Sequence, residues 1–297
     1  MARLNKDIIN NFPALVRKPL RDKEFSVIMD ELLETTSFIY ESSLKKALKK
    51  EEVLYEEDFT AENGQKITLY CSTPIEEWDL YDIGIGILPK GYFCNLSAIF
   101  YHGLTNQVPT TIYTGIEEYR EKDRPKKSVQ LSDHAIFSAF AKPPRATKHI
   151  YTFPNGRIVI TKKVARGNIG IKTVRSKRGL IPKGAKVAGL ERSLIDAVIN
   201  PHYNGGIKAV VEYFQAAAQR VDAKIVMKVY EKLRLQYPYW QALGFISELG
   251  GCSDISVALQ RNYKPKNIFY VDHMAKTNWA FNKKWQVYYP RGLKDEN

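Results

Sequence analysis

One stretch, residues 41–71, sets the fold of the first part of this 297-residue chain, and it reads ESSLKKALKKEEVLYEEDFTAENGQKITLYC. Its first ten residues have the apolar spacing of an amphipathic helix. One side of that helix carries Leu44, Ala47 and Leu48, and the opposite side carries serines and lysines. The stretch therefore begins with a helix over residues 41–50 that has one apolar face to bury and one cationic face to expose.

The rest of the stretch predicts a β-hairpin. Residues 53–59 and 66–71 alternate apolar and polar side chains, as half-buried strands do. Asn63-Gly64 lies between them and indicates a tight turn, because both residues tolerate positive φ. Residues 24–35 have helical apolar spacing. A helix, a basic helix and a hairpin in this order are typical of a winged-helix module, so we expect a winged-helix-like domain over residues 1–90.

The cationic face of the 41–50 helix is the first candidate for contact with DNA. A recognition helix presents short polar and cationic side chains along one exposed face. The candidates are Ser42, Ser43, Lys45, Lys46, Lys49 and Lys50. An ordinary solvated surface helix is the alternative interpretation. The predicted wing carries four acids that repel phosphate, so we do not expect its tip to lie on the DNA backbone; these are Glu56, Glu57, Asp58 and Glu62.

Positive charge is concentrated in one quarter of the chain. The whole sequence has 45 Lys and Arg against 32 Asp and Glu, a net charge of +13. Residues 120–190 contain 18 of those basic residues and only three acids. The net charge of the other residues of the chain is therefore close to zero. A concentrated positive field attracts polyanions, of which nucleic acid is the commonest. An acidic protein partner, a membrane surface and a merely solvated face are the alternatives.

Much of this charge falls on a segment with strand-like alternation. Residues 150–153, 158–164 and 169–174 alternate and are separated by glycine-containing turns, which predicts a basic antiparallel meander. Its cations are the second candidate site, for phosphate or for an acidic partner. We call them the central cations: Lys162, Lys163, Arg166, Lys172, Arg175, Lys177 and Arg178.

The last third of the chain has helical periodicity over residues 190–199, 206–219, 223–234 and 239–249, and short strand-like runs close the sequence. The predicted fold class is therefore α+β. A winged-helix-like domain, 1–90, precedes a larger α+β domain, 91–297, which combines the basic meander with a helical C-terminal third.

The sequence lacks the usual motifs of catalysis and of membrane insertion. Its five histidines are dispersed, with no metal-binding spacing, and no nucleophile-elbow or phosphate-loop motif occurs. The three cysteines, Cys71, Cys94 and Cys252, form no pair motif, so we expect buried free thiols. No apolar run is long enough to span a bilayer, and no signal peptide follows the first residue. We expect a cytoplasmic protein without enzymatic activity, cofactor, metal or membrane partner.

Four segments resemble a known family. They are GYFCNLSAIFYHGLTNQVPTTIY at 91–113, GLERSLIDAVINPHYNGG at 189–206, YPYWQALGF at 237–245, and the closing run from Trp285 to Leu293. Together they resemble, in register, the AbiEi antitoxin family of type IV toxin–antitoxin systems. The resemblance does not extend to residues 1–90, where family members usually carry a compact three-helix winged helix with a basic wing.

The resemblance implies a function. It implies an N-terminal winged-helix domain that binds double-stranded DNA at its own promoter, so that the protein represses its own operon. It also implies a C-terminal domain that counters a nucleotidyltransferase-like toxin, with direct contact between the two left open. A stand-alone nucleic-acid-binding adaptor without a toxin partner, and a degenerate nuclease, are the alternative hypotheses.

Overall fold

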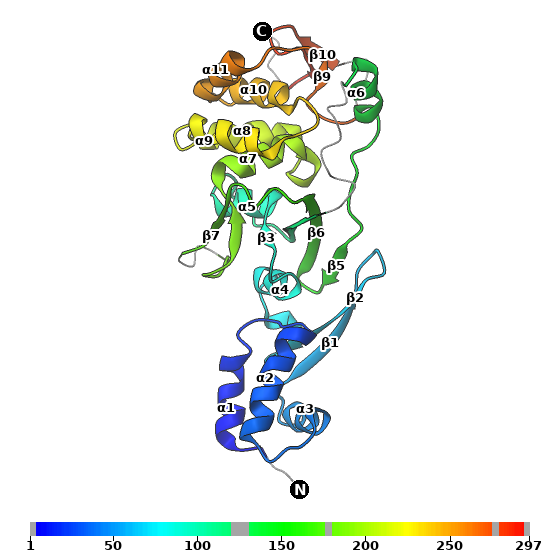
Figure 1. Ribbon diagram of the computed structural model, residues 1–297, viewed down its shortest axis with the longest axis vertical. Coiled ribbons are helices and arrows are strands. Elements are labelled where there is room, and N and C mark those ends of the chain that lie inside the picture. The colour runs from blue at the N-terminus through cyan, green and yellow to red at the C-terminus, as the bar shows by residue number, and fades with distance from the viewer. Residues whose placement is uncertain (1–3, 120–130, 176–179, 275–278, 294–297) are drawn as a thin grey trace.

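The computed structural model describes residues 4–119, 131–175, 180–274 and 279–293. The molecule is elongated, with the first helices at one tip and the last strands at the other (Figure 1). Helices and strands are mixed along the chain, so the α+β class predicted from the sequence is confirmed. A six-stranded sheet lies in the middle, between an N-terminal group of helices and a C-terminal layer of helices (Figure 1).

Three helices and a hairpin form the N-terminal tip. They are α1 (Lys6–Leu15), α2 (Asp22–Thr35), α3 (Glu41–Lys50), β1 (Tyr55–Thr60) and β2 (Lys66–Cys71). The bounds of α3 and of β2 match the prediction. Apolar side chains of the three helices and of β2 form one buried cluster, in which the rings of Phe25 and Tyr70 stack with centroids 4.0 Å apart. This cluster holds α3 against α2.

The predicted hairpin is confirmed, and its turn lies between the two predicted strands. Its loop spans residues 61–65 and is closed by two backbone hydrogen bonds between Ala61 and Gln65 and between Gly64 and Ala61, both 2.8 Å long. Of Asn63 and Gly64, only Gly64 has positive φ, at 84°. The Asn63 side chain instead accepts a hydrogen bond from the Gln65 amide at 3.1 Å. An Asn-Gly pair marks a turn well, but the loop length depends on where the strands stop pairing.

The central sheet has the strand order β5-β6-β4-β3-β8-β7. Its strands are β3 (Tyr92–Phe93), β4 (Thr111–Glu118), β5 (Ile150–Phe153), β6 (Gly156–Val164), β7 (Ile171–Thr173) and β8 (Lys186–Ala188). The pairs β5–β6, β3–β4 and β7–β8 are antiparallel, whereas β4–β6 and β3–β8 are parallel. The sheet is therefore mixed, and its two edges are β5 and β7.

The predicted basic meander is wrong. β5 and β6 form the expected hairpin, but β7 pairs with β8 at the opposite edge of the sheet. The loop after β6 is held by the Glu117 carboxylate, which accepts the backbone amides of Arg166 and Asn168, at 2.6 and 2.9 Å. Alternation identifies strands, but it carries no information on which strands pair.

Helices cover both faces of this sheet. On one face lies α4 (Leu80–Ile87), whose buried side chains pack on Ile112, Ile158 and Ile160. The residues just before the predicted domain boundary at 90 thus contain a helix buried against the sheet. On the other face lie α5 (Asn95–Tyr101) and α7 (Leu190–Ile199) (Figure 1). The buried cluster on the α4 face also takes in side chains of β2, so it draws on both sides of residue 90.

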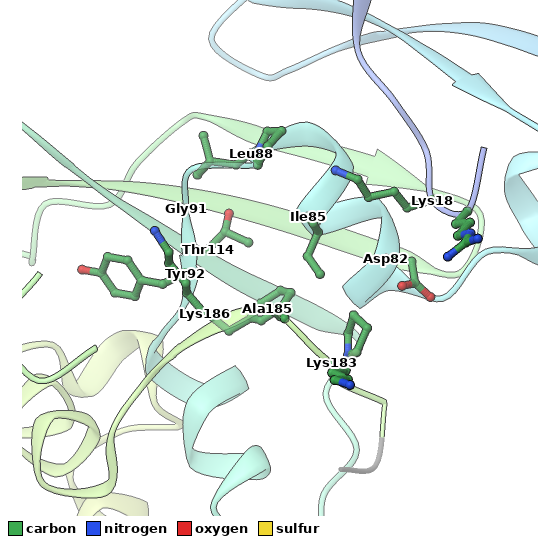
Figure 2. Close-up of a pocket in the computed structure, with 16 residues that line it drawn as sticks. Lys18, Asp82, Ile85, Leu88, Gly91, Tyr92, Thr114, Lys183, Ala185 and Lys186 are labelled. Atoms are coloured by element: carbon green, nitrogen blue, oxygen red, sulfur yellow. The ribbon is translucent and has the colours of Figure 1, made fainter. Parts of the chain in front are cut away.

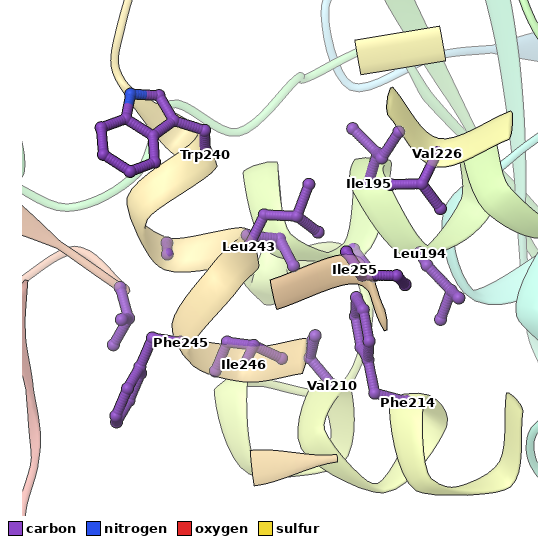
Figure 3. Close-up of a cluster of buried hydrophobic side chains, with 14 of the residues drawn as sticks. Leu194, Ile195, Val210, Phe214, Val226, Trp240, Leu243, Phe245, Ile246 and Ile255 are labelled. Carbon is purple, nitrogen blue, oxygen red and sulfur yellow. The ribbon is translucent and has the colours of Figure 1, made fainter. Parts of the chain in front are cut away.

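The helical C-terminal third is confirmed. After α7 follow α8 (Ile207–Ala217), α9 (Ala223–Leu233), α10 (Tyr239–Leu249) and α11 (Ser253–Asn262), the last of which the sequence analysis did not predict. Figure 3 shows how side chains from these helices, among them Leu194, Phe214 and Ile246, meet in one core. A three-stranded sheet, β9 (Phe269–Tyr270), β10 (Trp279–Asn282) and β11 (Val287–Pro290), and α6 (Asp133–Phe140) lie beside this core (Figure 1).

Candidate nucleic-acid interface

The helix α3 is positioned by its apolar side. Leu44 and Leu48 are fully buried against α2 and β2. Because these two residues are four apart, they lie on one face of the helix, and the opposite face is turned to solvent. The sequence pattern that predicts the helix therefore also fixes which side of it is exposed.

The exposed side of α3 carries the predicted DNA-reading residues. Ser42, Ser43, Lys46, Lys49 and Lys50 are exposed, and Lys45 is half-buried. Their helix lies at the N-terminal tip of the molecule (Figure 1). The structure thus brings all six candidates onto one short helix, as expected.

Only part of the charge on this face is uncompensated. The Lys45 ammonium lies 2.8 Å from a Glu41 carboxylate oxygen and 4.8 Å from the centre of the Tyr70 ring. The Lys49 ammonium lies 2.7 Å from Glu56 on the hairpin. Lys46 and Lys50 have no ion pair with any residue that the structure describes. These two lysines are therefore best placed to meet an anion.

Two apolar residues next to this face were not singled out from the sequence. Ile39 is 81% exposed and Tyr40 is 68% exposed, and both precede the first turn of α3. Their apolar character alone predicted burial, since large apolar side chains are usually inside. Their position does indicate exposure, because they lie between two predicted helices and belong to the apolar face of neither.

The hairpin is not a free wing. Its loop contacts the central sheet, where the Glu62 amide donates to the carbonyl oxygen of Ile150 at 3.0 Å. The rings of Phe59 and Phe153 lie 4.6 Å apart. On β1, burial and the nearby charge of Glu76 raise the pKa of Glu57. The acidic hairpin therefore connects the N-terminal helices to β5, and its tip is turned toward the body of the protein.

The central cations do not form one surface. Lys162 and Lys163 are adjacent on β6, so their side chains point to opposite faces of the sheet. The Lys162 side chain is 44% exposed and lies 3.0 Å from Glu118 on the α4 face. Arg175 is exposed beyond β7, at the other edge. Lys177 and Arg178 lie outside the described residues. The sequence grouped these cations because it took their strands to be neighbours.

Lys163 belongs to a buried charge cluster, which comprises Glu117, Lys163, Arg192 and Asp196. The Lys163 ammonium lies 2.7 Å from one Asp196 oxygen, and the Arg192 Nε donates to the other at 3.0 Å. Arg192 Nη1 lies 3.9 Å from Glu117. The prediction that Lys163 contacts phosphate is wrong in this structure, because its charge is turned inward onto α7.

Burial and ion pairing act against each other in this charge cluster. Burial alone would raise the pKa of Asp196, but the Lys163 and Arg192 charges outweigh it and hold that pKa below its usual value. Burial likewise favours neutral Lys163, yet the Asp196 charge raises the pKa of Lys163 above its usual value. The members therefore stay charged. Asp196 therefore acts as a buried hydrogen-bond acceptor for Lys163 and Arg192.

The other central cations also contact the protein. Arg166 Nε donates to the carbonyl oxygen of Leu233 at 3.2 Å, which ties the loop after β6 to the end of α9. The Lys172 ammonium lies 3.8 Å from Glu191 on α7. Both side chains thus help to hold the loop after β6 and the strand β7 against the helices. The exposed lysines of α3 are therefore the better candidates for contact with phosphate.

The three cysteines are buried thiols, and the described residues gather no set of metal ligands. Cys71, Cys94 and Cys252 are buried and free, as expected, and burial raises the pKa of Cys71 to about 12. In the described ranges no three His, Cys, Asp or Glu side chains gather as a ligand set. Nor does any helix in those ranges have both the length and the apolar content needed to cross a bilayer.

Comparison with known proteins identifies a shared fold. No family model and no curated protein matches this chain. Among solved structures, it is similar to the crystal structure of the RV2827C protein from Mycobacterium tuberculosis, with a TM-score of 0.57 and 12% sequence identity, over 97% of this chain and 92% of that chain. At this identity the likeness concerns the fold alone. The whole arrangement of N-terminal helices, central sheet and helical third is therefore one that another natural protein also adopts.

Proposed function

We propose that this protein is a DNA-binding antitoxin that represses its own type IV toxin–antitoxin operon and counters a nucleotidyltransferase-like toxin. The observation that carries the DNA-binding part is the exposed serine and lysine face of α3, which is docked by buried Leu44 and Leu48. The AbiEi-like segments in residues 91–293 support the antitoxin part. Such a repressor works by binding rather than by catalysis, and it works in the cytoplasm.

In this proposal the N-terminal tip is a winged-helix-like module whose recognition helix is α3. Its first turn, with Ser42 and Ser43, enters the major groove, since recognition helices read base edges mainly with their N-terminal residues. Lys46 and Lys50 lie four apart on the exposed side and contact phosphate oxygens. The helix follows α2 closely, and the two are packed together as in a helix-turn-helix.

The hairpin has a different role from that of a DNA-binding wing. It is acidic, and its loop is held against β5 by the Glu62–Ile150 hydrogen bond. DNA contact in this proposal therefore comes from α3 without support from the wing tip. The toxin-directed part lies in residues 91–297, away from the tip that carries α3.

The DNA-binding part is tested with a charge-reversal pair and a matched control. The test variant is Lys46→Glu with Lys50→Glu. The control is Lys224→Glu with Lys228→Glu, an exposed lysine pair with the same spacing on α9. The probe is the DNA upstream of the protein's own gene, compared with random DNA of equal length. Loss of two phosphate contacts should lower the slope of log affinity against log salt by about 2.

The two variants should separate clearly. We expect the α3 variant to lose at least tenfold in affinity for the upstream DNA, while the α9 variant binds as the wild type does. Equal losses of affinity in both variants would show that binding depends on the net charge of the protein and not on a contact made by α3. Wild-type affinity that is independent of salt, or equal for the two DNAs, would end the repressor hypothesis.

The antitoxin part is tested by co-expression with the nucleotidyltransferase-like gene of the same operon. We expect growth to be rescued by the wild type and also by the α3 variant, because toxin neutralisation is assigned to residues 91–297. Failure of the wild type to rescue growth, or the absence of such a gene beside this one, would favour the stand-alone nucleic-acid-binding adaptor.

A further inference from the structure

A cavity of about 500 Å³ lies where the N-terminal helices meet the central sheet, and we call it the junction cavity. Its walls come from four separate parts of the chain: residues 17–18 between α1 and α2, residues of α4, of the turn after it and of β3, Thr114 of β4, and residues 182–186, which lead into β8. Figure 2 shows Lys18, Asp82 and Lys183 toward one end and Leu88, Tyr92 and Lys186 toward the other. Small-molecule sites in proteins have volumes of about 300–1,000 Å³, so the size fits a ligand.

The polar side chains around this cavity are mostly cations. Arg17, Lys18, Lys183 and Lys186 line it, and among its described lining residues Asp82 is the single acid. The Lys18 ammonium forms an ion pair with a Glu24 carboxylate oxygen 3.2 Å away. Lys183 and Lys186 are exposed and have no ion pair with a described residue. Cations brought together from positions about 165 residues apart repel one another, and an anionic ligand relieves that repulsion.

The rest of the cavity wall is apolar. Ile85, Leu88 and Pro89 come from α4 and the turn after it, Phe93 from β3, and Pro182 from the opposite wall. Ile85 and Leu88 are only half-buried, so part of their apolar surface faces the cavity. An apolar wall beside clustered cations is suited to a ligand that joins a flat ring to a strongly anionic group.

We infer that the junction cavity binds a nucleoside phosphate. The base packs against Ile85, Leu88 and Pro89, and the phosphates lie near Lys18 and Lys183. Among common metabolites, nucleoside phosphates combine a flat ring with two or more negative charges, and they fill a volume of this size. The site is separate from α3 and does not depend on the DNA-binding proposal, so either can fail alone.

Calorimetric titration of the full-length protein tests this inference. The probes are the diphosphates of adenosine, guanosine, cytidine and uridine, with free adenosine and inorganic pyrophosphate as half-ligands. We expect at least one diphosphate to bind with a stoichiometry of one and at least tenfold more tightly than either half-ligand. Pyrophosphate binding as tightly as every nucleoside diphosphate would overturn the inference, because the apolar wall would then contribute nothing.

Two variants and one control locate the binding. Lys183→Glu places a negative charge at the phosphate end and should weaken binding at least tenfold, the usual effect of losing a charge-assisted contact. Ile85→Trp fills the base end and should abolish binding while the thermal midpoint stays within a few degrees of that of the wild type. Lys90→Glu makes the same charge change at an exposed lysine that does not line the cavity, and it should bind normally.

Besides equal binding of pyrophosphate, any of three results contradicts the inference. The first is that no nucleoside diphosphate binds at millimolar concentration. The second is that binding is unchanged in both the Lys183→Glu and the Ile85→Trp variants. The third is that Lys90→Glu weakens binding as much as Lys183→Glu does, which would show that the effect depends on net charge.

Discussion

The neighbours Lys162 and Lys163 have opposite surroundings. The sequence treats them as two equal cations of one basic segment. On β6, however, one side chain lies at the surface beside Glu118, and the other is 18% exposed and held by Asp196. The alternation of a strand was visible in the sequence, but the ion-pair partner of Lys163 is Asp196 on α7, 33 residues later. Its role could therefore not be read from local pattern.

This pair gives a prediction of stability. Lys163→Gln removes one partner of a buried ion pair and should cost about 3 kcal/mol, since Asp196 would keep only Arg192. That corresponds to a fall of about 6 °C or more in the thermal midpoint. Lys162→Gln removes a surface ion pair and should cost about 0.5 kcal/mol or less. Thermal unfolding measures both, and equal midpoints for the two variants would contradict the inward orientation of Lys163.

His202 gives a prediction of pH dependence. Both ring nitrogens are buried and have no hydrogen-bond partner among the described residues, and the ring lies 4.0 Å from that of Tyr203. Burial, helped by the His273 charge, lowers the pKa of His202 to about 4. Between pH 6.5 and 4 the unfolded chain therefore binds a proton that the folded protein does not, so stability falls as the pH falls through this window.

Replacement of His202 by Gln should remove this loss. The urea midpoint of the variant should fall less than that of the wild type between pH 6.5 and 4, and the two curves should run parallel above pH 7. His134→Gln, at an exposed position on α6, controls for the loss of a histidine and should follow the wild-type curve. A His202→Gln curve that is parallel to the wild type throughout would show that His202 is not buried in its neutral form.

Among the elements, those with their own periodicity could be predicted and those that depend on distant partners could not. The helices α3, α7 and α10 begin and end where their apolar stripes do. The caps at Ser132 and Asp222 were also predictable, because a side-chain oxygen one residue before a helix accepts its first amides. The strand β7 was placed in the wrong pairing, since its partner β8 follows it in the chain and local alternation carries no information on pairing.

The candidate site divides in the same way. The α3 face follows from the helix pattern alone, so its six residues could be named from the sequence. The central cations needed the sheet order, which local alternation does not contain. The junction cavity needed four chain segments to meet, so no motif pointed to Arg17, Lys183 or Lys186.

The helix α4 gives a prediction at this scale. A Cβ at Gly86 would overlap the carbonyl oxygen of Pro19, so this glycine lets α4 approach the segment between α1 and α2. Gly86→Ala should therefore destabilise the protein by about 1–3 kcal/mol despite the better helix propensity of alanine. Gly84→Ala, on the same helix, would meet side-chain atoms alone, a Phe93 ring carbon at 3.2 Å and the Thr114 methyl at 3.4 Å, and should cost much less. Chemical denaturation compares them, and equal effects would contradict the close approach.

Across the whole molecule, the hairpin β1–β2 is what joins the N-terminal helices to the central sheet. Side chains of β2 enter two buried clusters: Tyr70 packs with the helices, while Ile67 and Leu69 pack with the sheet. The predicted boundary at residue 90 stays a prediction, but the buried contacts cross it. The position of α3 relative to the sheet should then depend on how well the hairpin loop is held against β5.

Phe59→Ala tests this connection. The substitution removes the ring contact with Phe153 but leaves the Phe25–Tyr70 stack that holds α3. We expect the hydrogen exchange of the Glu62 amide, which donates to Ile150, to quicken about tenfold, equivalent to about 1.4 kcal/mol of local stability. Amides of α3 should exchange as in the wild type, because their core is intact. Val27→Ala, at a residue 55% exposed on α2, should change neither. If exchange in α3 quickens as much as at Glu62, the hairpin and the N-terminal helices open together, and the loop contact is then part of one cooperative unit rather than a separable joint.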